Sequence, residues 1–213
     1  MQQLSSTTIT KIKVVLFVVC LTPLAELVYG TFAGTLGANP VETMTHITGL
    51  WALRLLLATL AISPVRELIG WPWLLRLRRT IALYAFFYAA LHMLIYLVFD
   101  EFFDWPEIAK DIVKRPWLTA GFFSFVVMIP LAITSTNGMM KRLGRNWQRL
   151  HRLIYPIAAG AVLHYFWLVK RDVSEPTLYA LILAVLLCAR FGDRRKKRPA
   201  PAAAARHGIA PSA

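Results

Sequence analysis

Charged residues are scarce in this chain, and acidic residues are the scarcest. Only 16% of the 213 residues are Asp, Glu, Lys or Arg, whereas 57% are hydrophobic, and there are 11 acidic residues against 24 basic ones. A soluble domain of this length normally carries more charge and fewer apolar residues. The composition therefore argues against a water-soluble enzyme and predicts an integral membrane protein.

Cysteine is nearly absent, and the common nucleotide-binding motifs are missing. Cys20 and Cys188 stand apart in apolar stretches, so the sequence has no CxxC pair for zinc or dithiol chemistry and no CxxCH for covalent haem attachment. It contains neither GxGxxG nor GxxxxGK[ST]. A redox protein with this sequence would hold any haem non-covalently and would take electrons from a separate flavoprotein or from membrane quinol.

Long apolar runs are abundant. A bilayer core about 30 Å thick needs roughly 20 apolar residues per helix. Six segments are candidates, the last of them short: 12–29, 46–62, 80–99, 117–134, 151–169 and 177–190. We predict an all-α integral membrane protein, a six-transmembrane-helix bundle in one domain over 12–190. Residues 1–11 would form a cytoplasmic N-terminus, and 191–213 a basic, disordered cytoplasmic tail.

The basic residues are distributed unevenly between the predicted loops. If the N-terminus is inside, 18 Lys and Arg residues lie on the inner side and 5 on the outer side. This pattern predicts that both termini are cytoplasmic. The charge then reflects topology and attraction to anionic lipid, not nucleic-acid binding. The acidic, aromatic loop 100–117 would lie outside, with a short interfacial helix starting near Pro106.

Two histidines lie deep inside apolar segments. His92 is about 18 Å along the third span and His164 about 20 Å along the fifth, and both spans run outward, so both residues reach the same depth in the outer half of the membrane. An ionisable residue inside a membrane is a candidate functional residue. Because imidazole ligates iron, we predict that these two residues hold one haem. The alternative is that each is a core histidine hydrogen-bonded to a neighbouring helix.

His151 lies at the inner end of the fifth span and is a second candidate ligand. It is separated from His164 by about 220° of helical rotation, so the two would not share a face unless Pro156 shifts the register. The third span offers no histidine at that level. His151 could instead contact a haem propionate or the head group of a quinone or flavin.

Several arginines are candidate cofactor contacts. Arg78, Arg79 and Arg149 lie at the inner side, where guanidinium groups suit propionates and flavin phosphate, although retention of topology also explains them. Arg54 lies deep in the second span and could pair with an outer propionate or with Glu26. His46 begins that span and is interpreted as a helix-start residue.

Five segments together resemble a known family, the MsrQ family, formerly called YedZ. They are LGANPVETMTHITGLWAL, LLLATLAISP, LRRTIALYAFFYAALHMLIY, ITSTNGMMKRLGRNWQRLHRLIY and HYFWLVK. The resemblance covers about residues 11–190. It implies a bacterial inner-membrane protein of the ferric-reductase-like class, with one or two b-type haems and an associated FMN. The histidines of the family match His92, His151 and His164.

The resemblance also implies a role and partners. Electrons would pass from the quinone pool, or from a cytoplasmic flavin reductase, to a periplasmic molybdopterin enzyme, MsrP, in a heterodimer. Reduction of methionine sulfoxide in periplasmic proteins would occur on that partner. Two alternatives stay open: a stand-alone membrane ferric or quinone reductase, and a non-redox membrane transporter with structural histidines.

Overall fold

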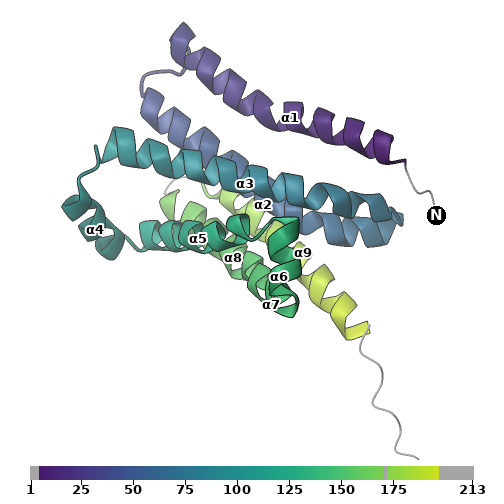
Figure 1. The fold of residues 1–213 in the computed structure, drawn as a ribbon. Helices are drawn as coiled ribbons and strands as arrows, with labels where there is room; N and C mark the ends of the chain where they lie inside the picture. Colours follow the sequence, from purple (N-terminus) through teal and green to yellow (C-terminus); the bar gives the residue numbers. More distant parts are fainter. Residues whose placement is uncertain (1–4, 170–171, 197–213) are drawn as a thin grey trace, which may run out of the picture.

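A computed structural model describes residues 5–169 and 172–196, and within these ranges there is no strand. Figure 1 shows long helices lying side by side, with α1 outermost, α4 at one end of the bundle, and α6 and α7 near the other end. In chain order the elements are α1 (Ser6–Ala33), α2 (Pro40–Ile69), η1 (Pro72–Leu74), α3 (Leu75–Ile95), the π-helical turn η2 (Tyr96–Asp100), α4 (Trp105–Lys114), α5 (Pro116–Ile133), α6 (Asn137–Leu143), α7 (Arg145–Leu150), η3 (His151–Leu153), α8 (Ile154–Leu168) and α9 (Ser174–Lys196). The predicted all-α class is confirmed.

Capping residues determine where α2 begins and ends. The Asn39 side chain accepts a hydrogen bond from the Glu42 backbone N–H at 3.3 Å, and Pro40 occupies the first helical position. Proline suits that position because its missing N–H would have no partner there. At the other end Gly70 takes a left-handed conformation, with φ 73°, which favours glycine. The helix therefore starts six residues before the predicted span at 46.

Among the described residues, four helical stretches are long and apolar enough to cross a membrane: Ser6–Ala33, Pro40–Ile69, Pro72–Asp100 and Pro116–Ile133. They correspond to the first four predicted spans. The fifth predicted span matches η3 followed by α8, which has 15 residues, and the sixth matches α9. The structure supports a membrane protein, and the number of six crossings stays a prediction.

The helices pack most closely as two pairs, α2 with α3 and α5 with α8. Small residues allow close approach in the core, where Ala85 of α3 and Ala158 of α8 are both 0% exposed. Tyr88 is also buried, and its hydroxyl donates to the Cys20 carbonyl oxygen of α1 at 2.7 Å. This bond ties α1 to the α2–α3 pair (Figure 1).

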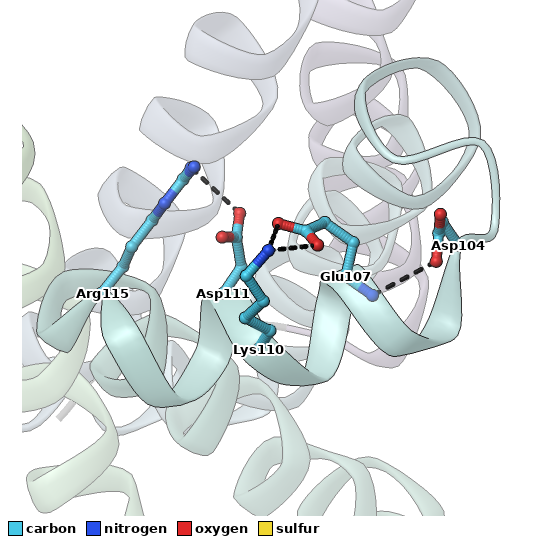
Figure 2. A network of polar contacts seen from close by, with 5 residues as sticks. All are labelled: Asp104, Glu107, Lys110, Asp111 and Arg115. Carbon is cyan, nitrogen blue, oxygen red and sulfur yellow. Dashed lines mark hydrogen bonds and ion pairs between the residues drawn. The ribbon is translucent and has the colours of Figure 1, made fainter.

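The helix predicted near Pro106 is confirmed as α4, which is amphipathic and joins α3 to α5. Figure 2 shows its polar face: Asp104 caps the helix by accepting from the Glu107 backbone N–H, and Arg115 pairs with the buried Asp111 at 3.0 Å. Glu107 also accepts hydrogen bonds from Lys110 at 2.7 and 2.6 Å, which raises the pKa of that lysine. These bonds are local and stabilise α4 itself, which lies at the end of the bundle at which α3 ends and α5 begins (Figure 1).

The last helix, α9, continues to Lys196, beyond the predicted end of the sixth span at residue 190. The remainder of the predicted tail, 197–213, lies outside the described residues.

Candidate functional site

A cavity of about 710 Å³ lies between α2, α3, α5 and α8, and both His92 and His164 line it. Their ring centroids are 6.2 Å apart, and the ring planes meet at 79°. The two imidazoles thus lie next to each other, as their predicted common ligand role requires, and their common depth in a membrane stays a prediction. Their role as ligands remains a prediction.

Each imidazole is fixed by a backbone carbonyl of the neighbouring helix. His92 Nδ1 donates to the Thr45 carbonyl oxygen at 2.9 Å, and His164 Nδ1 donates to the Trp117 carbonyl oxygen at 2.7 Å. A carbonyl oxygen can only accept, so the proton of each neutral ring must sit on Nδ1. Each Nε2 therefore carries the lone pair, which is the arrangement found in metal-ligating histidines.

Two glycines make room for these rings. A Cβ at Gly49 would lie 2.9 Å from His92 Nδ1 and 3.0 Å from its Cε1. A Cβ at Gly121 would lie 2.8 Å from His164 Nδ1 and 3.0 Å from its Cε1. Any side chain at either position would push the imidazole from its place. The sequence analysis did not identify these glycines.

The cavity fits a metal held mainly by a large planar group. Two imidazole–metal bonds of roughly 2 Å each, with the two ring radii added, span roughly 6 Å, close to the distance between the rings. Within 5–169 and 172–196 no cluster of three or more His, Cys, Asp or Glu could hold a bare ion. A porphyrin supplies four ligands of its own, so two axial histidines suffice. The Thr45 hydroxyl, buried without a hydrogen-bond partner in the described protein, also faces this cavity.

One end of the cavity is polar. Asn39, Glu42, Asp100, Glu101 and Arg115 line it there, from the start of α2, the end of η2 and the start of α5. His46 lines the cavity too, with its ring in edge contact with the Tyr165 ring at 6.1 Å. The sequence left open whether His46 is a ligand, a propionate contact or a helix-start residue and favoured the last, because hydropathy does not indicate which face of α2 meets the cavity.

Arg54 lies elsewhere. Its Nε donates to the Tyr179 hydroxyl of α9 at 2.8 Å, and its guanidinium stacks 5.4 Å from the centre of the Trp51 ring. It is not among the residues lining the cavity. These contacts place Arg54 between α2 and α9, and its pairing with an outer propionate stays a prediction.

His151 is separate from the other two histidines and does not line the cavity. Its ring stacks on Trp147 with centroids 4.0 Å apart, and its Nε2 lies 3.1 Å from Thr134 Oγ1. Trp147 Nε1 in turn donates to the Thr134 carbonyl oxygen at 2.9 Å. These contacts give His151 a defined orientation at the far end of the bundle.

The three inner arginines do not form one cluster. Arg78 lines a small cleft with Arg190 and Tyr155, where Arg190 Nε donates to the Tyr155 hydroxyl at 3.0 Å. Arg79 donates to the Asn137 side chain of α6 at 2.8 Å, and Arg149 is exposed. Of the three, only Arg78 lies in a cleft with a second guanidinium group, a setting that suits an anionic group.

Comparisons with known proteins agree with this geometry. Residues 48–162 match a family described as ferric reductase like transmembrane component. The chain is similar to the protein-methionine-sulfoxide reductase heme-binding subunit MsrQ of Herminiimonas arsenicoxydans, with 53% identity over 193 residues, 89% of this chain and 88% of that protein. It is similar to the protein of the same name from Xanthomonas axonopodis pv. citri, with 49% identity over 212 residues, 93% of this chain and 97% of that protein. No solved structure matches the chain.

Proposed function

This chain belongs to the MsrQ family of protein-methionine-sulfoxide reductase heme-binding subunits, and on that premise we propose that it is a membrane electron-transfer subunit that binds b-type haem between His92 and His164. The observation that carries the proposal is the pair of facing imidazoles, 6.2 Å apart, with each Nδ1 held by a backbone carbonyl. A histidine with a purely structural role could use either ring nitrogen for a backbone hydrogen bond. Both of these histidines use Nδ1, which leaves both Nε2 atoms turned away from the backbone.

The residues around the cavity have distinct roles in this proposal. A bound haem would supply an iron that exchanges single electrons. The apolar side chains of α2, α3, α5 and α8 would exclude water from it. Arg115, the one arginine at the polar end of the cavity, is suited to a propionate carboxylate. Its partner Asp111 would hold the guanidinium in place.

We propose six membrane crossings, by α1, α2, α3, α5, α8 and α9, with both termini in the cytoplasm of a bacterial inner membrane. The uneven distribution of Lys and Arg supports this orientation. The His92–His164 cavity then lies toward the periplasm, and His151 and Arg78 lie toward the cytoplasm. Electrons would enter at the inner end, from the quinone pool or from a cytoplasmic flavin reductase, and would leave at the outer end.

The proposed acceptor is a periplasmic molybdopterin reductase like MsrP, on which methionine sulfoxide is reduced. A second haem or an FMN at the inner end would need the imidazole of His151 and an anion-binding group such as Arg78. In the proposed orientation both of these side chains would lie at the inner end of the bundle. A stand-alone ferric or quinone reductase is the second candidate, because the ferric-reductase-like match by itself does not require a protein partner.

The proposal is tested by purifying the full chain after expression with ample haem. We expect a b-type reduced-minus-oxidised spectrum, at least one haem per chain, and reoxidation when the periplasmic molybdopterin reductase and methionine sulfoxide are added. A colourless, folded protein would reject haem binding and favour a non-redox transporter. A coloured protein that reduces ferric iron but never its periplasmic partner would favour the stand-alone reductase.

We expect His151→Ala to slow reduction of the protein while leaving the spectrum of the His92–His164 site intact. His151 does not line that cavity, so the loss should concern electron entry, by on the order of tenfold as for other residues that support a redox centre. Stopped-flow reduction by a quinol or by a flavin reductase measures it. Thr134→Val is the matched control, because it removes the hydroxyl beside Nε2 and retains the imidazole. An unchanged reduction rate in His151→Ala would assign the residue a structural role.

A further inference from the structure

Each imidazole, the backbone carbonyl that accepts from it and the glycine beside its ring form a unit that we call a histidine clamp. The two histidine clamps are repeats of each other. Each imidazole donates to a carbonyl 47 residues earlier in the chain. In each, the glycine that makes room for the ring lies four positions after that carbonyl, one helical turn further along. Adding 72 to the residue numbers 45, 49 and 92 gives 117, 121 and 164. The clamp formed by α2 and α3 therefore recurs, position for position, in α5 and α8.

The repeat extends through the cavity lining. Eleven lining residues of the α2–α3 half have a partner 72 positions later that also lines the cavity. The first members are Thr45, His46, Gly49, Leu50, Ala52, Leu53, Leu56, Ala89, His92, Met93 and Tyr96; the second are Trp117, Leu118, Gly121, Phe122, Ser124, Phe125, Met128, Ala161, His164, Tyr165 and Leu168. Only at the histidine, glycine and alanine positions are the two side chains identical. At the other eight pairs the two residues differ, although both line the cavity.

The remaining lining residues, which have no such partner, are all polar: Asn39, Glu42, Asp100, Glu101 and Arg115. They form the polar end described above. The cavity thus has a paired, largely apolar body and one unpaired polar end. This correspondence is the one expected if a pseudo-two-fold axis related the α2–α3 pair to the α5–α8 pair, as in parallel repeats whose axis follows the membrane normal.

We infer that Gly49 and Gly121 are equivalent positioning residues that fix the planes of the two axial imidazoles of the proposed haem site. The inference rests on the haem binding proposed above. Each glycine lets its histidine ring lie against the backbone of the opposite helix, within reach of the carbonyl one turn earlier. The two clamps together hold the ring planes at 79° to each other. Hydrogen bonding and orientation of the axial ligands are means by which a protein tunes a haem.

The test is electron paramagnetic resonance of the ferric holoprotein, because the g anisotropy of a low-spin bis-imidazole haem is greatest when the two ring planes are perpendicular. Wild type should give a strongly anisotropic low-spin signal. A signal typical of parallel planes would overturn the inference, whatever the variants do.

Gly49→Ala and Gly121→Ala should each move the largest g value and the midpoint potential away from wild type, and both variants should move them in the same direction. The control is a helical glycine that does not lie against either histidine ring. Gly138→Ala, with open space around its Cβ, should change nothing.

The outcomes separate the two proposals. A wild type without haem would reject the proposed function itself. A haem-loaded wild type whose Gly49→Ala and Gly121→Ala variants keep its g values and potential would reject only the positioning role. A change in just one of the two variants would reject their equivalence. If one alanine variant fails to fold, the other one decides the positioning role, and a wild-type signal typical of parallel planes would still overturn the inference.

Discussion

Replacing His92 or His164 with alanine is expected to abolish the low-spin haem spectrum of the purified protein. Each residue contributes one Nε2 to the cavity, and the described part of the chain places no third histidine at that spacing. Loss of a supporting residue around a metal ligand costs roughly 10–100-fold in affinity, and loss of the ligand itself should cost at least as much. The haem-to-protein ratio and the reduced-minus-oxidised spectrum measure the effect.

His46→Ala is the matched control for these substitutions. His46 lines the same cavity, but its described ring contact is with Tyr165, so its loss should leave the low-spin spectrum in place. Added imidazole should restore part of the signal in His92→Ala and in His164→Ala, because each substitution leaves a space of that shape against the glycine. If both variants kept the wild-type spectrum and haem ratio, the iron would have to be held elsewhere.

The common level of the two histidines was predictable because it depends mainly on distance along a helix, whereas their facing also requires a particular rotation of each helix. Both spans run in the same direction, and a fixed rise per residue places His92 and His164 at one depth. The ends of the helices were less predictable. Hydropathy placed the second span at 46, whereas Asn39 and Pro40 start the helix earlier by capping chemistry that hydropathy ignores.

The contacts of Arg54 and the glycine clamps depend on how helices are rotated against each other, and the apolar pattern of a membrane helix carries little of that information. All faces of such a helix are apolar, whether they meet lipid or protein. Arg54 therefore gave no sign that it meets Tyr179. Gly49 and Gly121 left one usable signal, their equal separation of 43 residues from His92 and His164. Detecting it required the knowledge that the two histidines are equivalent.

The repeat also explains why the end of the bundle near His151 differs from the end near His92 and His164. The position 72 residues before His151 is Arg79. At this pair of equivalent positions, one half of the repeat has an imidazole and the other half has a guanidinium. The guanidinium of Arg79 donates to the Asn137 side chain of α6. A pair of imidazoles like the outer one does not recur at this level in the described protein. Electron entry and electron exit would accordingly depend on differently built sites.

Ala158→Leu is expected to destabilise the bundle and reduce haem binding, although residue 158 touches no proposed ligand. Ala158 is fully buried in α8, where a larger side chain must push α8 away from its neighbours. Inserting methylene groups into a packed core costs about 1–3 kcal/mol, occasionally more. Close approach of α5 and α8 is also what brings the Trp117 carbonyl within 2.7 Å of His164 Nδ1, so separating these helices should open that clamp. The thermal unfolding temperature in detergent and the haem-to-protein ratio should therefore fall together.

Ala159→Leu makes the same change one residue along, at an exposed position of the same helix, and should leave both values near wild type. Equal losses in the two variants would mean that α8 tolerates no added volume on either face, and the link from packing to the histidine clamp would fail.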